Sequence, residues 1–395
     1  MKTNWQTKKL GEICEVVGGG TPKTTNGKYW NGDLCWVTPK DLGKLSGFEI
    51  VNTERKISEE GLKNSSAKLL PVGSVILSSR APIGYVFING VEMATNQGCK
   101  SFICGSEIHN KYLFYFLISN TQYLNSLGSG TTFKEVSGAT LKNIYITYPT
   151  LSEQKRIVKI LDESLKKITK AKENAGKNLQ YSKDLFESYS RNVFSNKEKN
   201  WDEKKLSEIC IVERGSSPRP IKKFFTEDPD GVNWIKIGDT KNVNRYIYST
   251  NQKITKAGAE KSRQVNVGDL ILSNSMSFGK PYIMKTQGYI HDGWFVLRPN
   301  QNMDTEYFYD VISSPQVQRQ FLDLASGSVV KNISGDLTKR AILPVPPIGE
   351  QRSIVKKLQS ISEQTKKLEA NYKQKIADLD ELKKSLLTKA FAGEL

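Results

Sequence analysis

The sequence predicts an α/β protein in which two globular domains, each with a mostly β core and some helices, are joined by two long antiparallel coiled-coil helices. Three observations predict this fold. The chain contains the same unit twice, and each unit ends in a long segment with an apolar stripe at heptad spacing. The length of 395 residues also suits at least two domains. The duplication predicts an internal repeat with a pseudo-two-fold axis.

Short strings that recur in the same order reveal the repeat. Trp5–Cys14 (WQTKKLGEIC) recurs as Trp201–Cys210 (WDEKKLSEIC), and Val72–Ser78 (VGSVILS) recurs as Val267–Ser273 (VGDLILS). The recurring strings lie about 195–198 residues apart along the whole chain. A period of that length is far too long for a solenoid, so the pattern indicates a duplicated unit.

The first part of each unit is predicted to be globular. Residues 1–150 and 200–347 are rich in Gly, Ser, Thr, Asn and aromatic residues, and they contain short apolar runs such as Ser74–Leu77. Such runs, separated by turn residues, predict strands. Tyr112–Ile118 and Tyr307–Ile312 are dense in aromatic and aliphatic residues and are predicted to be helical. These two parts are the predicted globular domains.

The remaining segments, 151–199 and 348–395, are predicted to be spacer helices. Their apolar residues recur at alternating steps of three and four, which is the seam of a coiled coil. If the two stripes bury each other, the second helix runs back towards the first domain, and the pair is antiparallel. Helix length would then set the distance between the domains. The alternative is that each helix packs separately on its own domain.

Composition and charge limit the class of protein. The chain has 58 Lys and Arg residues against 41 Asp and Glu residues, a net charge of +17. This excess favours a polyanionic partner, nucleic acid first, although a generically basic protein is the alternative. There is no apolar run of the length that crosses a membrane and no apolar segment typical of a signal peptide. The chain has five cysteines, an odd number, and their spacing is not that of a disulfide framework. We expect a soluble cytoplasmic protein that does not bind membranes.

No catalytic motif is complete. Val16–Thr25 is glycine-rich like a phosphate-binding loop but lacks the G-x-x-x-x-G-K-[ST] pattern. Val345–Ile348 is similar to a motif of amino-methyltransferases but lacks both the amide residue and the aromatic residue. Cys99, Cys104 and His109 have the composition of a partial zinc site without a fourth ligand. We therefore expect no catalytic residues, no metal and no cofactor on this chain.

Together these features resemble the specificity (S) subunits of type I restriction–modification enzymes, over the full chain. The resemblance rests on the duplication, on Trp-x-x-Lys-Lys-Leu-x-Glu-Ile at the start of each domain, on Pro-x-x-x-Glu-Gln-x-x-Ile-Val at the start of each helix, and on the ending Leu382–Leu395. It implies that the globular domains are target recognition domains, each of which recognises one half of a bipartite sequence in double-stranded DNA. It also implies that the helices dock two methylation (M) subunits, to which restriction (R) subunits bind. S-adenosylmethionine, ATP and magnesium would belong to those partner subunits.

Comparison of the two copies sorts the candidate DNA-binding residues. Positions that are identical in both copies cannot distinguish two half-sites. We therefore expect Lys134 and Lys331 to contact phosphate. The alternative is that each is simply a lysine on a solvent-exposed turn. Positions that differ between the copies are the candidates for contacts with bases, although drift also produces divergent polar loops. In the first copy these are Lys23, Thr24, Thr25, Asn26, Lys28, Tyr29, Arg80, Asn96 and Gln97. In the second copy they are Arg219, Lys222, Lys223, Asn274, Ser275, His291 and Asp292. Different loops predict an asymmetric DNA target.

Three functions of different classes fit the sequence. The first is a non-catalytic DNA-recognition subunit, whose apolar residues Phe194 and Phe391 are expected to be exposed and to bind the partner subunits. The second is a self-sufficient methyltransferase or nuclease, which requires binding of S-adenosylmethionine by the isolated chain. The third is a bivalent DNA-bridging scaffold without a modification partner. The resemblance favours the first function.

Overall fold

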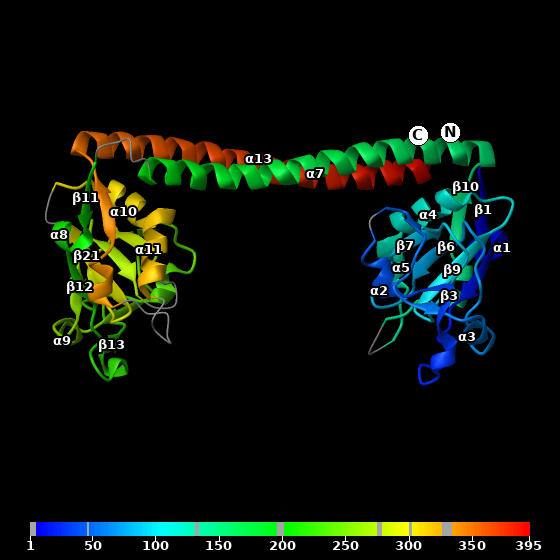
Figure 1. Cartoon of the computed structure of the whole chain (residues 1–395), viewed down its shortest axis with the longest axis horizontal. Coiled ribbons are helices and arrows are strands. Elements are labelled where there is room, and N and C mark those ends of the chain that lie inside the picture. The colour runs from blue at the N-terminus through cyan, green and yellow to red at the C-terminus, as the bar shows by residue number, and fades with distance from the viewer. Residues whose placement is uncertain are drawn as a thin grey trace. The chain divides into compact units, whose positions relative to one another are not determined.

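The structure is a computed structural model of the whole chain (Figure 1). It describes residues 5–45, 47–130, 134–195, 201–274, 279–299, 302–325 and 334–395. The chain forms two compact units: unit 1 contains Met1–Gly176 and Gln374–Leu395, and unit 2 contains Lys177–Lys373. Each unit therefore consists of one globular part and one half of each long helix.

The globular part of unit 1 is built on a five-stranded sheet with the strand order β2-β9-β6-β7-β4 and a three-stranded sheet with the order β5-β3-β8. Its strands are β1 (Gln6–Lys9), β2 (Cys14–Gly18), β3 (Trp30–Val37), β4 (Glu49–Ile50), β5 (Lys56–Ile57), β6 (Val75–Ser78), β7 (Val86–Asn89), β8 (Met93–Thr95), β9 (Cys99–Cys104) and β10 (Tyr145–Tyr148). Its helices are α1 (Leu10–Ile13), η1 (Gly27–Tyr29), α2 (Pro39–Leu42), α3 (Glu59–Lys63), α4 (Asn110–Ser119), α5 (Thr121–Ser126) and α6 (Gly138–Lys142).

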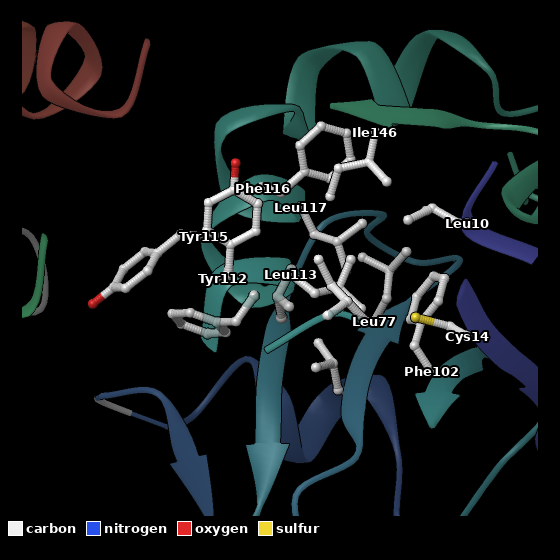
Figure 2. Packing of buried hydrophobic residues seen from close by; sticks show 14 of the residues in the cluster. Leu10, Cys14, Leu77, Phe102, Tyr112, Leu113, Tyr115, Phe116, Leu117 and Ile146 are labelled. Atoms are coloured by element: carbon white, nitrogen blue, oxygen red, sulfur yellow. The ribbon is translucent and has the colours of Figure 1, made fainter. Parts of the chain in front are cut away.

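The core of unit 1 lies on both faces of the five-stranded sheet. Every residue of β6 is buried, because its side chains point alternately into two apolar clusters. Val75 and Leu77 pack with the apolar residues of α4 on one face (Figure 2), whereas Ile76 packs against β3 and β8 of the smaller sheet on the other face. The predicted strand at 74–77 and the predicted helix at 112–118 correspond to β6 and α4.

Unit 2 repeats this topology. Its two larger sheets have the orders β12-β21-β18-β19-β15 and β13-β16-β14-β20-β17, and the second of them has two strands more, β13 and β17, than its three-stranded counterpart in unit 1. Its strands are β11 (Asp202–Lys205), β12 (Cys210–Arg214), β13 (Phe225–Thr226), β14 (Val232–Ile235), β15 (Tyr246–Ile247), β16 (Gln252–Ile254), β17 (Arg263–Val265), β18 (Leu270–Ser273), β19 (Pro281–Met284), β20 (Gly288–Ile290), β21 (Trp294–Pro299) and β22 (Ile342–Val345). Its helices are α8 (Leu206–Ile209), η2 (Ile221–Phe224), η3 (Ile237–Thr240), α9 (Lys256–Ala259), α10 (Thr305–Ser313), α11 (Pro315–Ala325) and α12 (Gly335–Thr338).

The recurring sequence strings have a structural reason. Gly73 and Gly268, in the repeated Val-Gly turn before the central strand, have φ angles of +87° and +93°. Only glycine adopts this conformation without strain, so both copies keep it. The beginning and end of each globular part are also held together, because β1 pairs with β10 and β11 pairs with β22, both antiparallel. The predicted duplication is thus present in the fold.

The long helices are α7 (Leu151–Ser195) and α13 (Ile348–Ala392). In unit 1 they run antiparallel: Lys172 of α7 pairs with Asp380 of α13 at 2.6 Å, and Arg156, near the start of α7, donates a hydrogen bond to the backbone oxygen of Leu395 at 2.6 Å. The two helix halves share one apolar cluster with the globular part of unit 1. The helices therefore pack both on each other and on the globular part, so the predicted alternative of separate packing is wrong for unit 1.

Unit 2 contains the other two helix halves. Phe186 and Tyr189 of α7 pack in the same apolar cluster as Ile354 and Leu358 of α13. Two positions of the predicted stripe differ: Leu382, in unit 1, is 52% exposed, and Leu368, in unit 2, is 39% exposed. Among the residues that the structure describes, no helix is long and apolar enough to cross a membrane.

Candidate nucleic-acid interface

The glycines after β2 allow two backbone segments to pack closely together and do not form a phosphate-binding loop. A Cβ on Gly19 would lie 1.9 Å from the carbonyl oxygen of Asn96, and a Cβ on Gly215 would lie 2.1 Å from that of His291. Only glycine permits this approach of two backbones. In both copies the loop after the first sheet strand is thereby held against the loop that precedes β9 or β21. The repeat thus brings two groups of predicted residues together in each unit.

In unit 1 this contact is part of a network of charged and polar side chains. Arg80 and Glu135 form an ion pair at 3.7 Å, and Lys100 Nζ donates to Glu135 Oε1 at 3.0 Å and to the backbone oxygen of Gln97 at 3.1 Å. The hydroxyl of Thr21 donates to the side-chain oxygen of Gln97. We call these residues, together with Asn96, the first loop cluster. Three of its members, Arg80, Asn96 and Gln97, were predicted from the sequence.

The second loop cluster occupies the equivalent place in unit 2. It consists of Arg214, Ser217, Arg219, Asn274, His291 and Asp292. Asp292 is at its centre: its carboxylate accepts a hydrogen bond from Ser217 Oγ at 2.7 Å and lies 3.7 Å from Arg219, and its backbone oxygen accepts one from Asn274 Nδ2 at 2.9 Å. The Ser217 hydroxyl holds the pKa of Asp292 below its usual value, and the nearby Arg219 acts in the same direction. The carboxylate is therefore ionised at neutral pH and can orient Arg219.

His291 holds the loop rather than projecting from it. Its Nδ1 accepts a hydrogen bond from the backbone N–H of Gly293 at 2.7 Å, and its Nε2 lies 3.2 Å from the backbone N–H of Ile237. A neutral imidazole has a single acceptor nitrogen, so the ring accepts a hydrogen bond from only one of these two N–H groups at a time. Burial lowers the pKa of His291, which keeps the ring neutral.

The remaining candidates of the first copy lie in the segment before β3. Lys23, Thr24, Thr25 and Lys28 are exposed, whereas Asn26 and Tyr29 are half-buried. Asn26 accepts a hydrogen bond from the backbone N–H of Lys28 at 3.2 Å and so caps η1. This η1 turn packs on α3, which lies at the end of the globular part remote from the long helix of its unit (Figure 1).

In unit 2, Lys222 and Lys223 are exposed on η2, which leads into β13. The labelled β13 and α9 likewise lie at the end of the globular part that is remote from the long helices of unit 2 (Figure 1). Lys134 is exposed beside Glu135 of the first loop cluster. Its predicted counterpart Lys331 and the candidate Ser275 lie outside the described residues.

Sequence comparison missed Lys100 and Glu135 in unit 1 and Arg214 and Ser217 in unit 2. The sequence did contain a signal for Lys100, because the two copies differ at this position. Lys100 follows Cys99 in the first copy, whereas Phe295 follows Trp294 at the equivalent place in the second copy. The divergence was overlooked because this position lies within a strand rather than in a loop.

The partial zinc site suggested by the sequence does not assemble. Cys99 is buried in the apolar cluster between the two sheets of unit 1, whereas Cys104 packs on the cluster at the opposite face. The two thiols therefore point away from each other across the sheet and cannot share a metal ion. Among the described residues, no group of three or more potential ligands comes together.

The expected exposure of Phe194 and Phe391 is wrong. Phe194 is only 4% exposed and packs 5.9 Å from the ring of Tyr307, and Phe391 is half-buried against Tyr112 at 5.1 Å. The reason is that the globular part of each unit covers these helix ends. Other large apolar side chains of the long helices are exposed instead: Leu151, Tyr181, Leu185, Leu368 and Leu382.

Comparison with known proteins agrees with this architecture. The chain is 36% identical over 243 residues to the type I restriction enzyme MjaIX specificity subunit of Methanocaldococcus jannaschii. The aligned residues cover 57% of this chain and 56% of that protein. It is 28% identical over 201 residues to a type I restriction enzyme specificity subunit of Escherichia coli, and the aligned residues cover 48% of that protein. The chain thus spans about half the length of these curated relatives. The MjaVIII specificity subunit of M. jannaschii is 22% identical across 99% of this chain and 93% of that protein.

Solved structures show the same fold. The HsdS subunit from Thermoanaerobacter tengcongensis superposes with a TM-score of 0.69 at 18% identity, over 100% of this chain and 98% of that chain. A chain from a study of complex assembly and conformational transition of the type I R-M system gives a TM-score of 0.76 at 19% identity, over 100% and 99% of the two chains. The family model for the type I restriction modification DNA specificity domain matches twice, at residues 2–176 and 198–378. The chain belongs to the family of type I restriction–modification DNA specificity proteins.

Proposed function

We propose that this chain is the sequence-specific DNA-binding subunit of a type I restriction–modification complex, in which each globular part recognises one half of an asymmetric bipartite target. The observation that carries the proposal is the equivalent position of the two loop clusters. They occupy the same place in a repeated fold, yet they present different side chains. The net charge of +17 supports a nucleic-acid partner.

The chemistry of the clusters suits contacts with base edges. Arg80 and Arg219 each lie 3.7 Å from a carboxylate of a neighbouring loop, Glu135 and Asp292 respectively. A guanidinium can donate two hydrogen bonds to guanine N7 and O6, and the nearby carboxylate attracts it electrostatically to this place. The amides of Asn96 and Gln97 suit adenine. Exposed lysines such as Lys134 suit phosphate oxygens.

We assign the chemistry of modification to partners. Two M subunits bind the helices, where large apolar side chains are exposed on α7 and α13, and R subunits join through the M subunits. S-adenosylmethionine, ATP and magnesium belong to these partners, and the chain itself is non-catalytic. The complex acts in the cytoplasm, on double-stranded DNA.

Co-expression tests this function. Cells without other methyltransferases would carry this chain together with the M subunit encoded beside it, and their DNA would be sequenced by a long-read method that detects modified bases. We expect methylation at one asymmetric two-part sequence that disappears when this chain is omitted. Specific DNA binding without any methylation would support the bridging scaffold instead. Binding of S-adenosylmethionine by the isolated chain, measured by calorimetry, would support a self-sufficient methyltransferase.

A further inference from the structure

Two cysteines of unit 1 face each other across neighbouring strands. Cys14 begins β2 and Cys104 ends β9, and they are direct partners in the antiparallel register. The backbone N–H of Gly105 bonds to the oxygen of Ile13 at 2.9 Å, one residue outside the pair on each strand. This pattern makes Cys14 and Cys104 a non-hydrogen-bonded pair, in which the Cα atoms are typically about 4.5 Å apart and the side chains are close. Such a separation lies within the range that a disulfide spans.

The two side chains also share one environment. Both contact the apolar cluster between the five-stranded sheet and α4, and Figure 2 shows the sulfur of Cys14 among the apolar side chains of that cluster. Contact with the Cys104 thiol, together with burial, raises the pKa of Cys14 far above its usual value. Cys104 is only half-buried and lines a surface pocket with Ser106 and His109, so a small molecule can reach it.

We propose that Cys14 and Cys104 are a dithiol that hydrogen peroxide converts into an intramolecular disulfide. The accessible thiol of Cys104 reacts first: its sulfur attacks one peroxide oxygen, an S–O bond forms, the O–O bond breaks and one water leaves. The Cys14 thiol then attacks the sulfenic sulfur of Cys104, an S–S bond forms, the S–O bond breaks and a second water leaves. The two thiols lose two electrons in total, and the peroxide gains them.

The second copy provides an internal comparison. Cys210 occupies the place of Cys14, but its partner across the strands is Pro299, so unit 2 cannot form this bond. The disulfide would fasten one end of the β2–β9 pair. The other ends of these strands lead to Gly19 and Asn96, which meet at the first loop cluster. Oxidation would therefore stabilise the strand pair that carries the recognition loops of only one half-site.

Oxidation of the full chain tests the proposal. The reduced protein would be treated with excess hydrogen peroxide, alkylated without reduction, digested and analysed by mass spectrometry. We expect a linked peptide that joins Cys14 to Cys104, and a fall in free thiols from the five of the reduced chain to three. Cys104→Ser should abolish the linked peptide, whereas the matched variant Cys210→Ser should leave it unchanged. Dithiothreitol should restore both thiols and lower the melting temperature of the oxidised protein by roughly 5 °C.

Two results would overturn the proposal. One is conversion of Cys104 to sulfinic or sulfonic acid while Cys14 remains free for alkylation. The other is a disulfide that joins Cys104 to Cys35 or Cys99 in place of Cys14. Because Cys104 is half-buried, its replacement by Ser is compatible with folding, and circular dichroism of the variant verifies this.

Discussion

Gln154 of α7 is bonded to the backbone of His109, which precedes α4: the N–H of His109 donates to Gln154 Oε1 at 2.8 Å. Gln351 of α13 accepts the same kind of bond from the N–H of Asp304, before α10, at 2.9 Å. Both glutamines are fully or almost fully buried. The Glu-Gln motif at the start of each long helix therefore fixes the helix on its own globular part. This motif is architectural, which explains why both copies keep it.

Replacement of Gln154 by Ala should destabilise unit 1 by about 2–4 kcal/mol. The side-chain amide of Gln154 also donates to the backbone oxygens of Glu107 at 2.9 Å and Pro149 at 2.8 Å, so the change leaves several buried groups without partners. Urea denaturation measures the loss. Gln364→Ala, at an exposed position of α13, is the matched control and should change stability by less than about 0.5 kcal/mol. Equal stability of both variants would show that the motif does not fix the helix.

Glu135→Gln should relax recognition of one half-site. The carboxylate pairs with Arg80 and Lys100, so its loss frees both cations and removes a negative charge from the proposed DNA-binding surface. We expect discrimination between the correct and wrong base to fall by about 1 kcal/mol in one half-site, while binding to non-specific DNA becomes tighter. Competition binding with singly substituted duplexes measures both quantities. Glu163→Gln, on the exposed surface of α7, is the control and should alter neither. If Glu135→Gln weakened all DNA binding without a change in base preference, the positioning role would be refuted.

Lys134→Ala should weaken binding to all sequences alike. An exposed lysine that contacts a phosphate releases about one counterion, so the slope of log K against log[salt] should become shallower by about 0.9. Binding measured at several salt concentrations gives the slope. Lys331→Ala should have the same effect if the two lysines are equivalent. An altered base preference at an unchanged salt slope would instead place Lys134 among the base-contacting residues.

Unit 2 should lose stability as the pH rises from about 4 to about 7. Burial raises the pKa of Asp310 to about 7, although the bonded Arg245 acts in the opposite direction. The second carboxylate oxygen of Asp310 is buried without a hydrogen-bond partner within the described part of the chain. The pKa of Asp310 is higher in the folded than in the unfolded state, so folding is coupled to the binding of a proton in this pH window. The stability that this proton contributes is lost as the pH rises and Asp310 ionises.

Melting temperatures at pH 5 and pH 8 test this pH dependence. Asp310→Asn should reduce the difference between the two temperatures, whereas Asp184→Asn, at an exposed position of α7 in the same unit, should leave it unchanged. An unaltered pH dependence in Asp310→Asn would show that another group is responsible.

Much of the fold could be predicted from the sequence, because local periodicity determines it. The run at Ser74–Leu77 is apolar at almost every position because β6 is covered on both faces, and the heptad stripe marks the helix face that packs in unit 1. Phe194 could not be placed, because an apolar residue at a helix end can pack on its own domain or on a partner. The ion pair of Arg80 with Glu135 could not be predicted either, because it joins residues that only the tertiary fold brings together.

The most direct test of the central claim, that each loop cluster recognises its own half-site, is a methylation map of cells that carry the M subunit with the double variant Arg80→Ala and Gln97→Ala. Both residues belong to the first loop cluster, which lies in unit 1. The account predicts that the methylated sequence becomes degenerate in one half while the bases of the other half and the spacer between them stay the same. A simultaneous change in both halves, or an unchanged target, would contradict it.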